Sequence, residues 1–141
     1  MSTPENSPYW SAPERAQPLR HSLSLPGSKS LTNRELVLAA LAEGPSTLRR
    51  PLHSRDTALM VEALRSLGAI ITEIPGEGAF GPDLAITPIP AGHNVSASID
   101  CGLAGTVMRF VPPLAAMVTG TLRFDGDIGA RRRPMATTLH A

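Results

Sequence analysis

Three short segments of the sequence combine basic side chains with residues that typically begin helices. Residues 26–30 read Pro-Gly-Ser-Lys-Ser, and Arg34 follows four positions after Ser30. A tight turn, hydroxyls, an ammonium group and the free amides of a helix start together favour an anion-binding site. Arg34, one helical turn further along, could donate two hydrogen bonds to a phosphate or carboxylate group. Taken alone, the segment is more commonly a plain turn with Ser30 as helix cap and solvated basic side chains.

The second segment carries Gly102, Gly105 and Thr106 where another helix is expected to begin. Glycine lets a ligand approach the backbone closely, and Arg109 follows about one turn later, so this segment would duplicate the first anion site. Glycine used only for helix packing, with Arg109 in a structural ion pair, explains the same residues equally well.

The third segment, residues 131–134, reads Arg-Arg-Arg-Pro. Proline favours the first turn of a helix, which would place Arg133 at the helix mouth where an anion would lie. A solvated basic loop is the alternative. Three basic helix starts in one small domain of near-zero net charge nevertheless indicate positive groups gathered on one surface.

Composition and spacing exclude several other functions. A net charge of +1, from 13 basic and 12 acidic residues, argues against binding of nucleic acid and favours a small anion. Neither residues 26–30 nor residues 102–106 have the glycine spacing of a nucleotide-phosphate loop or a dinucleotide fold. The single cysteine, Cys101, supports neither a disulfide nor a zinc site and is expected to be a packed residue in a reducing, cytoplasmic setting.

Hydrophobic periodicity indicates which elements position these segments. Alternation over residues 19–25 predicts a strand that ends at Pro-Gly. A Leu- and Ala-rich stretch over residues 31–43 predicts a helix. The residues near one apolar face of that helix are Leu31, Leu38, Leu41 and Ala42.

A second helix is predicted over residues 57–67, with Ser54 in the capping segment before it and Gly68 at its end. Its inward side chains are expected to be Leu59, Met60, Ala63, Leu64 and Leu67. Further strands are predicted at residues 47–49, 69–74, 84–87, 95–99 and 121–125. Residues 102–119 form an apolar segment that is expected to be a helix, with a kink or a restart at the prolines 112–113. A last helix is predicted from residue 135.

The domain organisation follows from composition and from this order of elements. Residues 1–18 are Pro-rich and polar and are expected to form a flexible tail, whereas residues 19–141 form the folded part. No apolar run approaches the ~20 residues of a membrane span, so a soluble protein is expected. A repeated strand, helix, strand, helix unit with its last helix stopped after about two turns predicts a fragment of a larger domain.

The three segments together resemble a known family. Residues 25–30, followed by Asn33 and Arg34, are similar to the opening motif of the 5-enolpyruvylshikimate-3-phosphate (EPSP) synthase family, and residues 103–106 with Arg109, then Arg133-Pro134, follow in the family order. The resemblance covers residues 19–141 and implies an α/β (α+β) fold. The chain would then be an N-terminal fragment: a partial lobe of the two-lobed, inside-out α/β barrel, with the first βαββαβ unit and the start of the second.

The resemblance also implies a function. The family transfers the enolpyruvyl (carboxyvinyl) group of phosphoenolpyruvate to the 5-hydroxyl of 3-phosphoshikimate and releases phosphate, in the shikimate pathway to aromatic amino acids. It uses no metal or organic cofactor, and glyphosate competes with phosphoenolpyruvate. The whole protein is expected to be monomeric. The resemblance implies that Lys29, Ser30 and Arg34 bind 3-phosphoshikimate and that Lys29, Gly105 and Arg133 bind phosphoenolpyruvate. Lys29 is also the implied catalytic residue. Thr106 and Arg109 are expected to lie next to these residues without contacting substrate.

The sequence departs from the family pattern at several points. Leu103 and Phe110 stand where many members have Asn and Pro, which leaves glyphosate sensitivity open. The family's acid and base carboxylates lie in a later part, so the 141 residues alone are expected to be inactive. Asp56 and Asp100 are explained as a helix cap and a strand-end turn.

Two other functions are alternatives. The related UDP-N-acetylglucosamine enolpyruvyl transferases have Lys-Asn where this chain has Lys29-Ser30, so the serine disfavours them. A noncatalytic phosphate-binding module, complete as it stands, would use the same helix starts only to hold an anion.

Overall fold

A computed structural model describes residues 9–10, 12–77 and 79–139. The parts of the predicted tail and last helix at residues 1–8, 11 and 140–141 lie outside these residues. The helices are α1 (Lys29–Ala40), α2 (Arg55–Ser66), α3 (Gly105–Ala115), α4 (Ile128–Arg131) and α5 (Ala136–Leu139), and the strands are β1 (Ser46–Leu48), β2 (Ile70–Ile74), β3 (Asp83–Thr87), β4 (Ala97–Asp100) and β5 (Leu122–Asp125).

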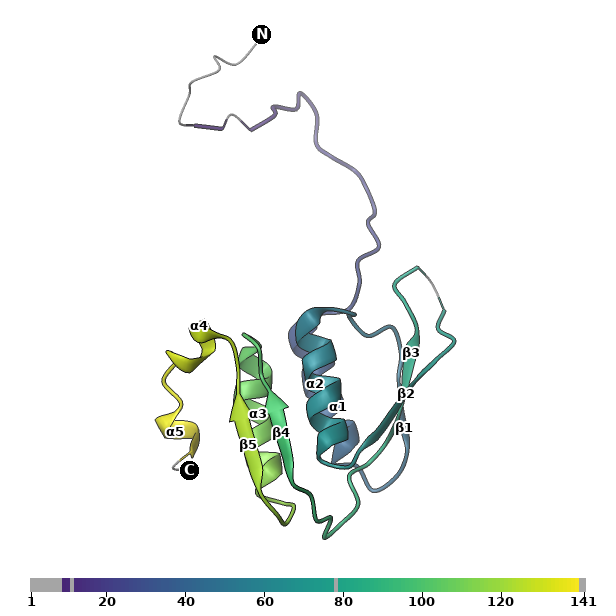
Figure 1. Cartoon of the computed structure of the whole chain (residues 1–141). Helices are drawn as coiled ribbons and strands as arrows, with labels where there is room; N and C mark the ends of the chain where they lie inside the picture. The colour runs from purple at the N-terminus through teal and green to yellow at the C-terminus, as the bar shows by residue number, and fades with distance from the viewer. Residues whose placement is uncertain (1–8, 11, 78, 140–141) are drawn as a thin grey trace.

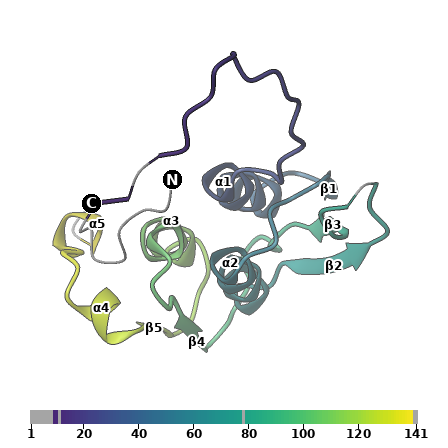
Figure 2. The same ribbon diagram turned by 90° about the horizontal axis from the view of Figure 1, so that it is seen from above.

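The three long helices lie side by side and begin at the same end of the molecule (Figure 1). Seen along their axes, α1, α2 and α3 form a triangle (Figure 2). Strands β1, β3 and β2 form an antiparallel sheet in that order, and this sheet contacts α1 and α2. Strands β4 and β5 pair in parallel, with α3 as the crossover between them. This arrangement brings the residues before each long helix to one edge.

Helix α2 shows most directly why the sequence folds this way. Ser54 lies in the extended region before the helix, and its side chain accepts a hydrogen bond from the amide of Thr57. Asp56 in the first turn and Arg65 in the last turn both complement the helix dipole. The predicted cap and helix are confirmed, as are the expected inward side chains, since Leu59 is partly buried and the others are buried.

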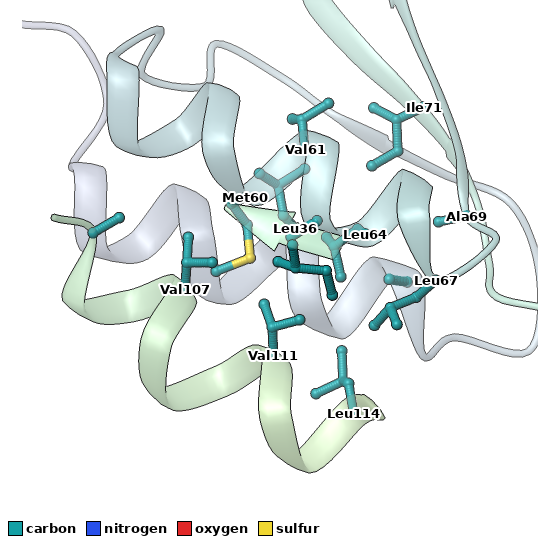
Figure 3. Close-up of a cluster of buried hydrophobic side chains, with 14 of the residues drawn as sticks. Leu36, Met60, Val61, Leu64, Leu67, Ala69, Ile71, Val107, Val111 and Leu114 are labelled. Carbon is teal, nitrogen blue, oxygen red and sulfur yellow. The ribbon is translucent and has the colours of Figure 1, made fainter. Parts of the chain in front are cut away.

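The core lies where the three long helices meet (Figure 3). Leu36 of α1, Met60 and Leu64 of α2, and Val107 and Val111 of α3 are all fully buried there. Truncating one of the larger side chains to alanine would cost about 2–5 kcal/mol of unfolding free energy. The packing therefore fixes the relative positions of the three helix starts.

The predictions for the first strand and for the buried face of the first helix are wrong. The predicted strand at residues 19–25 is absent: the described residues before Lys29 lie in no helix or strand. Alternation supplies an apolar face, but a strand also needs a neighbour, and the described strands pair only with one another. The apolar face predicted for α1 is not the buried one. Leu31, Leu38 and Leu41 are exposed, and the buried residues of α1 are Thr32, Asn33, Leu36 and Ala40.

The order of elements also differs from the predicted βαββαβ unit. A single strand, β1, separates α1 from α2, and β2, β3 and β4 separate α2 from α3. The mixed α/β content is as predicted. At residues 112–113 the helix does not restart: both prolines lie inside α3, which continues to Ala115. Because proline has no N–H group, the carbonyl groups one turn before the two prolines receive no helix hydrogen bond from them.

Candidate anion site at the helix starts

The start of α1 is held against the chain segment that leads into α2. A Cβ atom on Gly27 would lie 2.9 Å from the carbonyl oxygen of Arg50, so only glycine allows this approach. Thr32, buried in the first turn, accepts a hydrogen bond of 3.0 Å from the amide of Leu52. Arg50 itself has a φ of 50° and donates its amide to the carboxylate of Asp83 at 2.7 Å. These contacts place the residues just before α2 beside Lys29.

Lys29 forms an ion pair across the two helix starts. Its Nζ lies 2.8 Å from Oδ2 of Asp56, in the first turn of α2. The lysine side chain is 53% exposed and the aspartate 24%, so the ammonium group still faces solvent. A pair this exposed contributes little to stability, typically less than about 1 kcal/mol. Its main consequence is that the lysine is held in one place.

The start of α3 is joined to α1 by a partly buried hydrogen bond between two side chains. Nδ2 of Asn33 donates to Oγ1 of Thr106 at 2.6 Å, and Asn33 is fully buried. Oδ1 of Asn33 has no hydrogen-bond partner among the described residues. A buried amide of this kind is costly to disturb, because the groups left unpaired lose their hydration as well as their partner. The bond sets the spacing between the α1 and α3 starts.

Gly105, the first residue of α3, lies between two guanidinium groups. A Cβ atom at this position would lie 3.2 Å from Nη1 of Arg109 and 3.4 Å from Nη1 of Arg133. Nη1 of Arg133 donates to the carbonyl oxygen of Leu103 at 3.0 Å, whereas Arg109 reaches the Gly105 carbonyl only at the long distance of 3.5 Å. Backbone amides and two cations therefore meet around one glycine.

Neither α1 nor α3 is capped by a side chain. Ser28 precedes α1 and Ala104 precedes α3 in extended conformations, and neither side chain accepts a hydrogen bond from the helix in the described structure. The first amides of a helix have no acceptor within it. These two starts therefore present N–H groups and the positive end of the helix dipole, together with Lys29 and Arg133.

Other residues predicted for the site have fewer side-chain contacts in the structure. Ser30 and Arg34 are exposed on α1, and neither side chain has a hydrogen bond or ion pair with another described residue. Asp100 accepts a hydrogen bond of 2.8 Å from the amide of Gly102, which confirms the strand-end turn. The cap of α2 is Ser54 rather than Asp56.

Two further ion pairs border the segment that carries Arg133. Arg55 donates two hydrogen bonds to Asp127, at 3.0 and 3.2 Å, and Arg131 donates two to Asp125, both at 2.8 Å. Hydrogen bonding to Asp127 is the main cause of the raised pKa of Arg55. The Arg131 guanidinium, helped by the Gly126 amide, lowers the pKa of the Asp125 carboxyl.

An open cavity of about 260 Å³ adjoins Arg133 and is lined mainly by apolar side chains such as Met108, Phe124 and Met135. Cys101 also lines it and is buried with a free thiol. Burial, followed by the charges of Asp100 and Asp125, raises the pKa of that thiol. Cys101 is therefore a packed thiol rather than an activated nucleophile, as the sequence indicated.

The sequence predicts Lys29, Gly105 and Arg133 as site residues, but it does not indicate which residues hold their side chains in place. In the sequence, Asn33 belongs to a motif, and its position among the apolar residues of a helix is a signal of a buried contact. Asp56 is expected to be a helix cap, whereas in the structure it pairs with Lys29. The pair between Arg55 and Asp127, which lie 72 positions apart, has no local signal in the sequence.

In residues 9–10, 12–77 and 79–139, no group of three or more His, Cys, Asp or Glu side chains is placed to hold a metal ion. Within the same described ranges, none of the helices has both the length and the apolar character needed to cross a membrane.

Comparison with known proteins identifies the family of the chain. A family model described as EPSP synthase (3-phosphoshikimate 1-carboxyvinyltransferase) matches residues 13–141. A curated relative from Kocuria rhizophila, named 3-phosphoshikimate 1-carboxyvinyltransferase, is 62% identical over an alignment of 135 residues, and this alignment covers 92% of this chain and 30% of the relative.

The fold is similar to solved structures as well. Two structures of EPSP synthase from Acinetobacter baumannii are each 25% identical to the chain, with TM-scores of 0.62 and 0.64. They cover 80% and 84% of this chain, which in turn spans 25% and 26% of theirs. The motif residues, the shared fold and a family match over nearly all of the sequence lead to one conclusion: the chain belongs to the EPSP synthase family.

Proposed function

We propose that the protein to which these 141 residues contribute transfers the enolpyruvyl group of phosphoenolpyruvate to the 5-hydroxyl of 3-phosphoshikimate and releases phosphate. The name of the Kocuria rhizophila relative supports this activity. The chain spans about a third of that relative, so the proposal concerns the whole protein. The 141 residues alone are expected to have no transferase activity.

One structural observation carries the proposal. Two helix starts without side-chain caps lie at the same end of the molecule, joined by the Asn33 to Thr106 hydrogen bond, and each carries basic side chains. Two anionic substrates that react with each other need two adjacent cationic sites, and holding them together removes much of the entropic barrier. A single phosphate-binding helix start would not meet this requirement.

The residues divide between the two substrates in this proposal. Lys29, Ser30 and Arg34 on α1 hold 3-phosphoshikimate, and the Gly105 amide with Arg133 holds phosphoenolpyruvate. Lys29 touches both, because its helix start is tied to that of α3. Fixed cations at this place also stabilise the negative charge that moves onto the departing phosphate. Thr106 positions Gly105, and Arg109 adds charge beside it.

We also propose that the chain forms part of one lobe of the two-lobed, inside-out α/β barrel. The exposed leucines Leu31 and Leu38 of α1, and Leu41 directly after it, support this arrangement. Exposed apolar side chains on one helix face favour packing against further helices. Residues 1–18 as a tail, a monomeric whole protein and a cytoplasmic location stay proposals of the same kind, and the free thiol of Cys101 supports a reducing compartment.

A chimeric enzyme tests the proposed activity. Residues 1–141 of this chain would replace the matching part of the Kocuria rhizophila relative, and phosphate release from phosphoenolpyruvate and 3-phosphoshikimate would be measured. We expect turnover that requires both substrates. A folded chimera without turnover, beside an active unsubstituted relative, would contradict the proposal. Turnover with UDP-N-acetylglucosamine in place of 3-phosphoshikimate would favour the related transferase instead.

A further inference from the structure

The start of α2 holds two other segments of the chain through two adjacent side chains. Asp56 pairs with Lys29 at the start of α1, at 2.8 Å. Arg55 pairs with Asp127, 72 positions further along the chain. One helix turn therefore lies between the lysine of the first segment and the loop that carries Arg133 of the third.

The Arg55 guanidinium is fixed in a defined orientation. It donates to both carboxylate oxygens of Asp127, at 3.0 and 3.2 Å, which is the bidentate geometry that orients as well as attracts. Its Nη2 also lies against Gly102, where a Cβ atom would approach to 3.2 Å. Gly102 has a φ of 48°, so a side chain there would be strained as well as crowded.

Asp127 in turn determines where Arg133 lies. The amide of Asp127 donates to the Gly102 carbonyl at 3.0 Å, and its own carbonyl accepts from the amides of Ala130 and Arg131, which builds the short helix α4. The Arg133 amide then donates to Ala130 at 2.9 Å. A continuous series of hydrogen bonds thus runs from Asp127 to Arg133.

We propose that Arg55 and Asp127 are positioning residues: their bidentate pair fixes the loop that carries Arg133 relative to Lys29, so that both cations meet the same pair of anionic substrates. The inference rests on the proposed function and assigns the pair no contact with substrate. Because the Arg55 side chain is 62% exposed and that of Asp127 37%, the pair contributes little to stability. Loss of the pair should therefore lower the affinity for the anionic substrates and the order of the loop that carries Arg133.

The chain offers a matched control. Arg131 and Asp125 form a second exposed bidentate pair, at 63% and 59% exposure, but they lie only six positions apart and join no distant segments. Arg131→Gln therefore removes the same chemistry without affecting the link between α2 and the Arg133 loop. Arg55→Gln removes the proposed link, and Arg55→Lys keeps the charge with fewer hydrogen bonds.

The test uses the chimeric enzyme with three measurements on each variant: thermal stability, amide hydrogen exchange at Asp127 and Arg133, and titration with phosphoenolpyruvate followed by NMR. We expect similar small losses of stability in Arg55→Gln and Arg131→Gln. Only Arg55→Gln should speed the two amide exchanges and weaken phosphoenolpyruvate binding, each by about fivefold, with a smaller effect in Arg55→Lys.

Equal exchange rates and affinities in Arg55→Gln and Arg131→Gln would overturn the inference. If the chimeric enzyme without these substitutions shows no binding of phosphoenolpyruvate, the site assignment fails. The exchange rates then still decide whether the pair positions the Arg133 loop, so failure of the proposed function and failure of the inference are distinguishable.

Discussion

The start of α2 differs from the starts of α1 and α3, although all three lie at the same end of the molecule (Figure 1). At α2 the Ser54 side chain satisfies the Thr57 amide, and the next two residues pair with other segments. At α1 and α3 no side chain of the described structure caps the helix.

This difference separates a structural joint from the proposed binding site. Helix α2 uses its first turn to hold the chain together, whereas at α1 and α3 no described side chain accepts from the first amides of the helix, which the proposed site would offer to a ligand. The same local feature, a helix start with a nearby cation, therefore has two uses, and the cap distinguishes them.

The largest expected effect follows from removing the cation at the α1 start. In the chimeric enzyme, Lys29→Ala should lower kcat by about a hundredfold to a thousandfold, the usual loss for one group that stabilises developing negative charge. Steady-state kinetics of phosphate release measures this. A change of less than about tenfold would remove Lys29 from its catalytic role.

A smaller loss is expected at the α3 start. Gly105→Ala places a methyl group 3.2 and 3.4 Å from the ends of two flexible arginine side chains, so the fold is retained while the guanidinium groups move. We expect phosphoenolpyruvate affinity to fall by about tenfold, equivalent to about 1.4 kcal/mol. The matched control is Gly44→Ala, because nothing lies within 4 Å of a Cβ atom there. Equal affinities in the two variants would contradict the assignment.

The next prediction compares two serines that precede helices. Ser54→Ala should lower the free energy of unfolding by about 1 kcal/mol, because it removes a side-chain cap from α2. Ser28→Ala should have little effect on stability, since Ser28 makes no such hydrogen bond. Denaturant unfolding of both variants measures the difference. Equal losses would show that the α1 start is capped in solution, against the comparison above.

The smallest expected effect concerns pH. The Arg131 pair holds the pKa of Asp125 below its usual value in the folded chain, so the pair stabilises the fold above the unfolded pKa and this contribution is lost as pH falls through the folded one. When the pH is lowered below about 4, the Tm of Arg131→Gln should therefore fall slightly less than the Tm of the unsubstituted chain. Thermal unfolding measures both values. Both groups are exposed, so the difference should be small. Identical pH profiles would mean that the pair contributes nothing in solution.

Local patterns predicted the parts of the fold that depend on local physics. The cap and inward face of α2 follow from Ser54 and from helical spacing, and β5 lies within the strand predicted at residues 121–125, where Leu122 and Phe124 alternate with polar residues. The strand at residues 19–25 was wrong because alternation does not reveal whether a neighbouring strand is present. The buried face of α1 was missed because polar Thr32 and Asn33 point inward, which depends on contacts with Leu52 and Thr106.

The site shows the same division. Motifs identified the groups that could face an anion, since glycine, lysine and arginine at helix starts have a chemical meaning by themselves. The groups that hold them, Asp56, Arg55 and Asp127, come from distant positions, and only the packing of three helices brings them together.

NMR titration of the chimeric enzyme with phosphoenolpyruvate tests most directly whether α1 and α3 form one anion site. The amides of Lys29 and Gly105 should shift together, with one dissociation constant, while the capped amide of Thr57 stays unchanged. Separate dissociation constants for Lys29 and Gly105, or a Thr57 shift that follows them, would contradict the account.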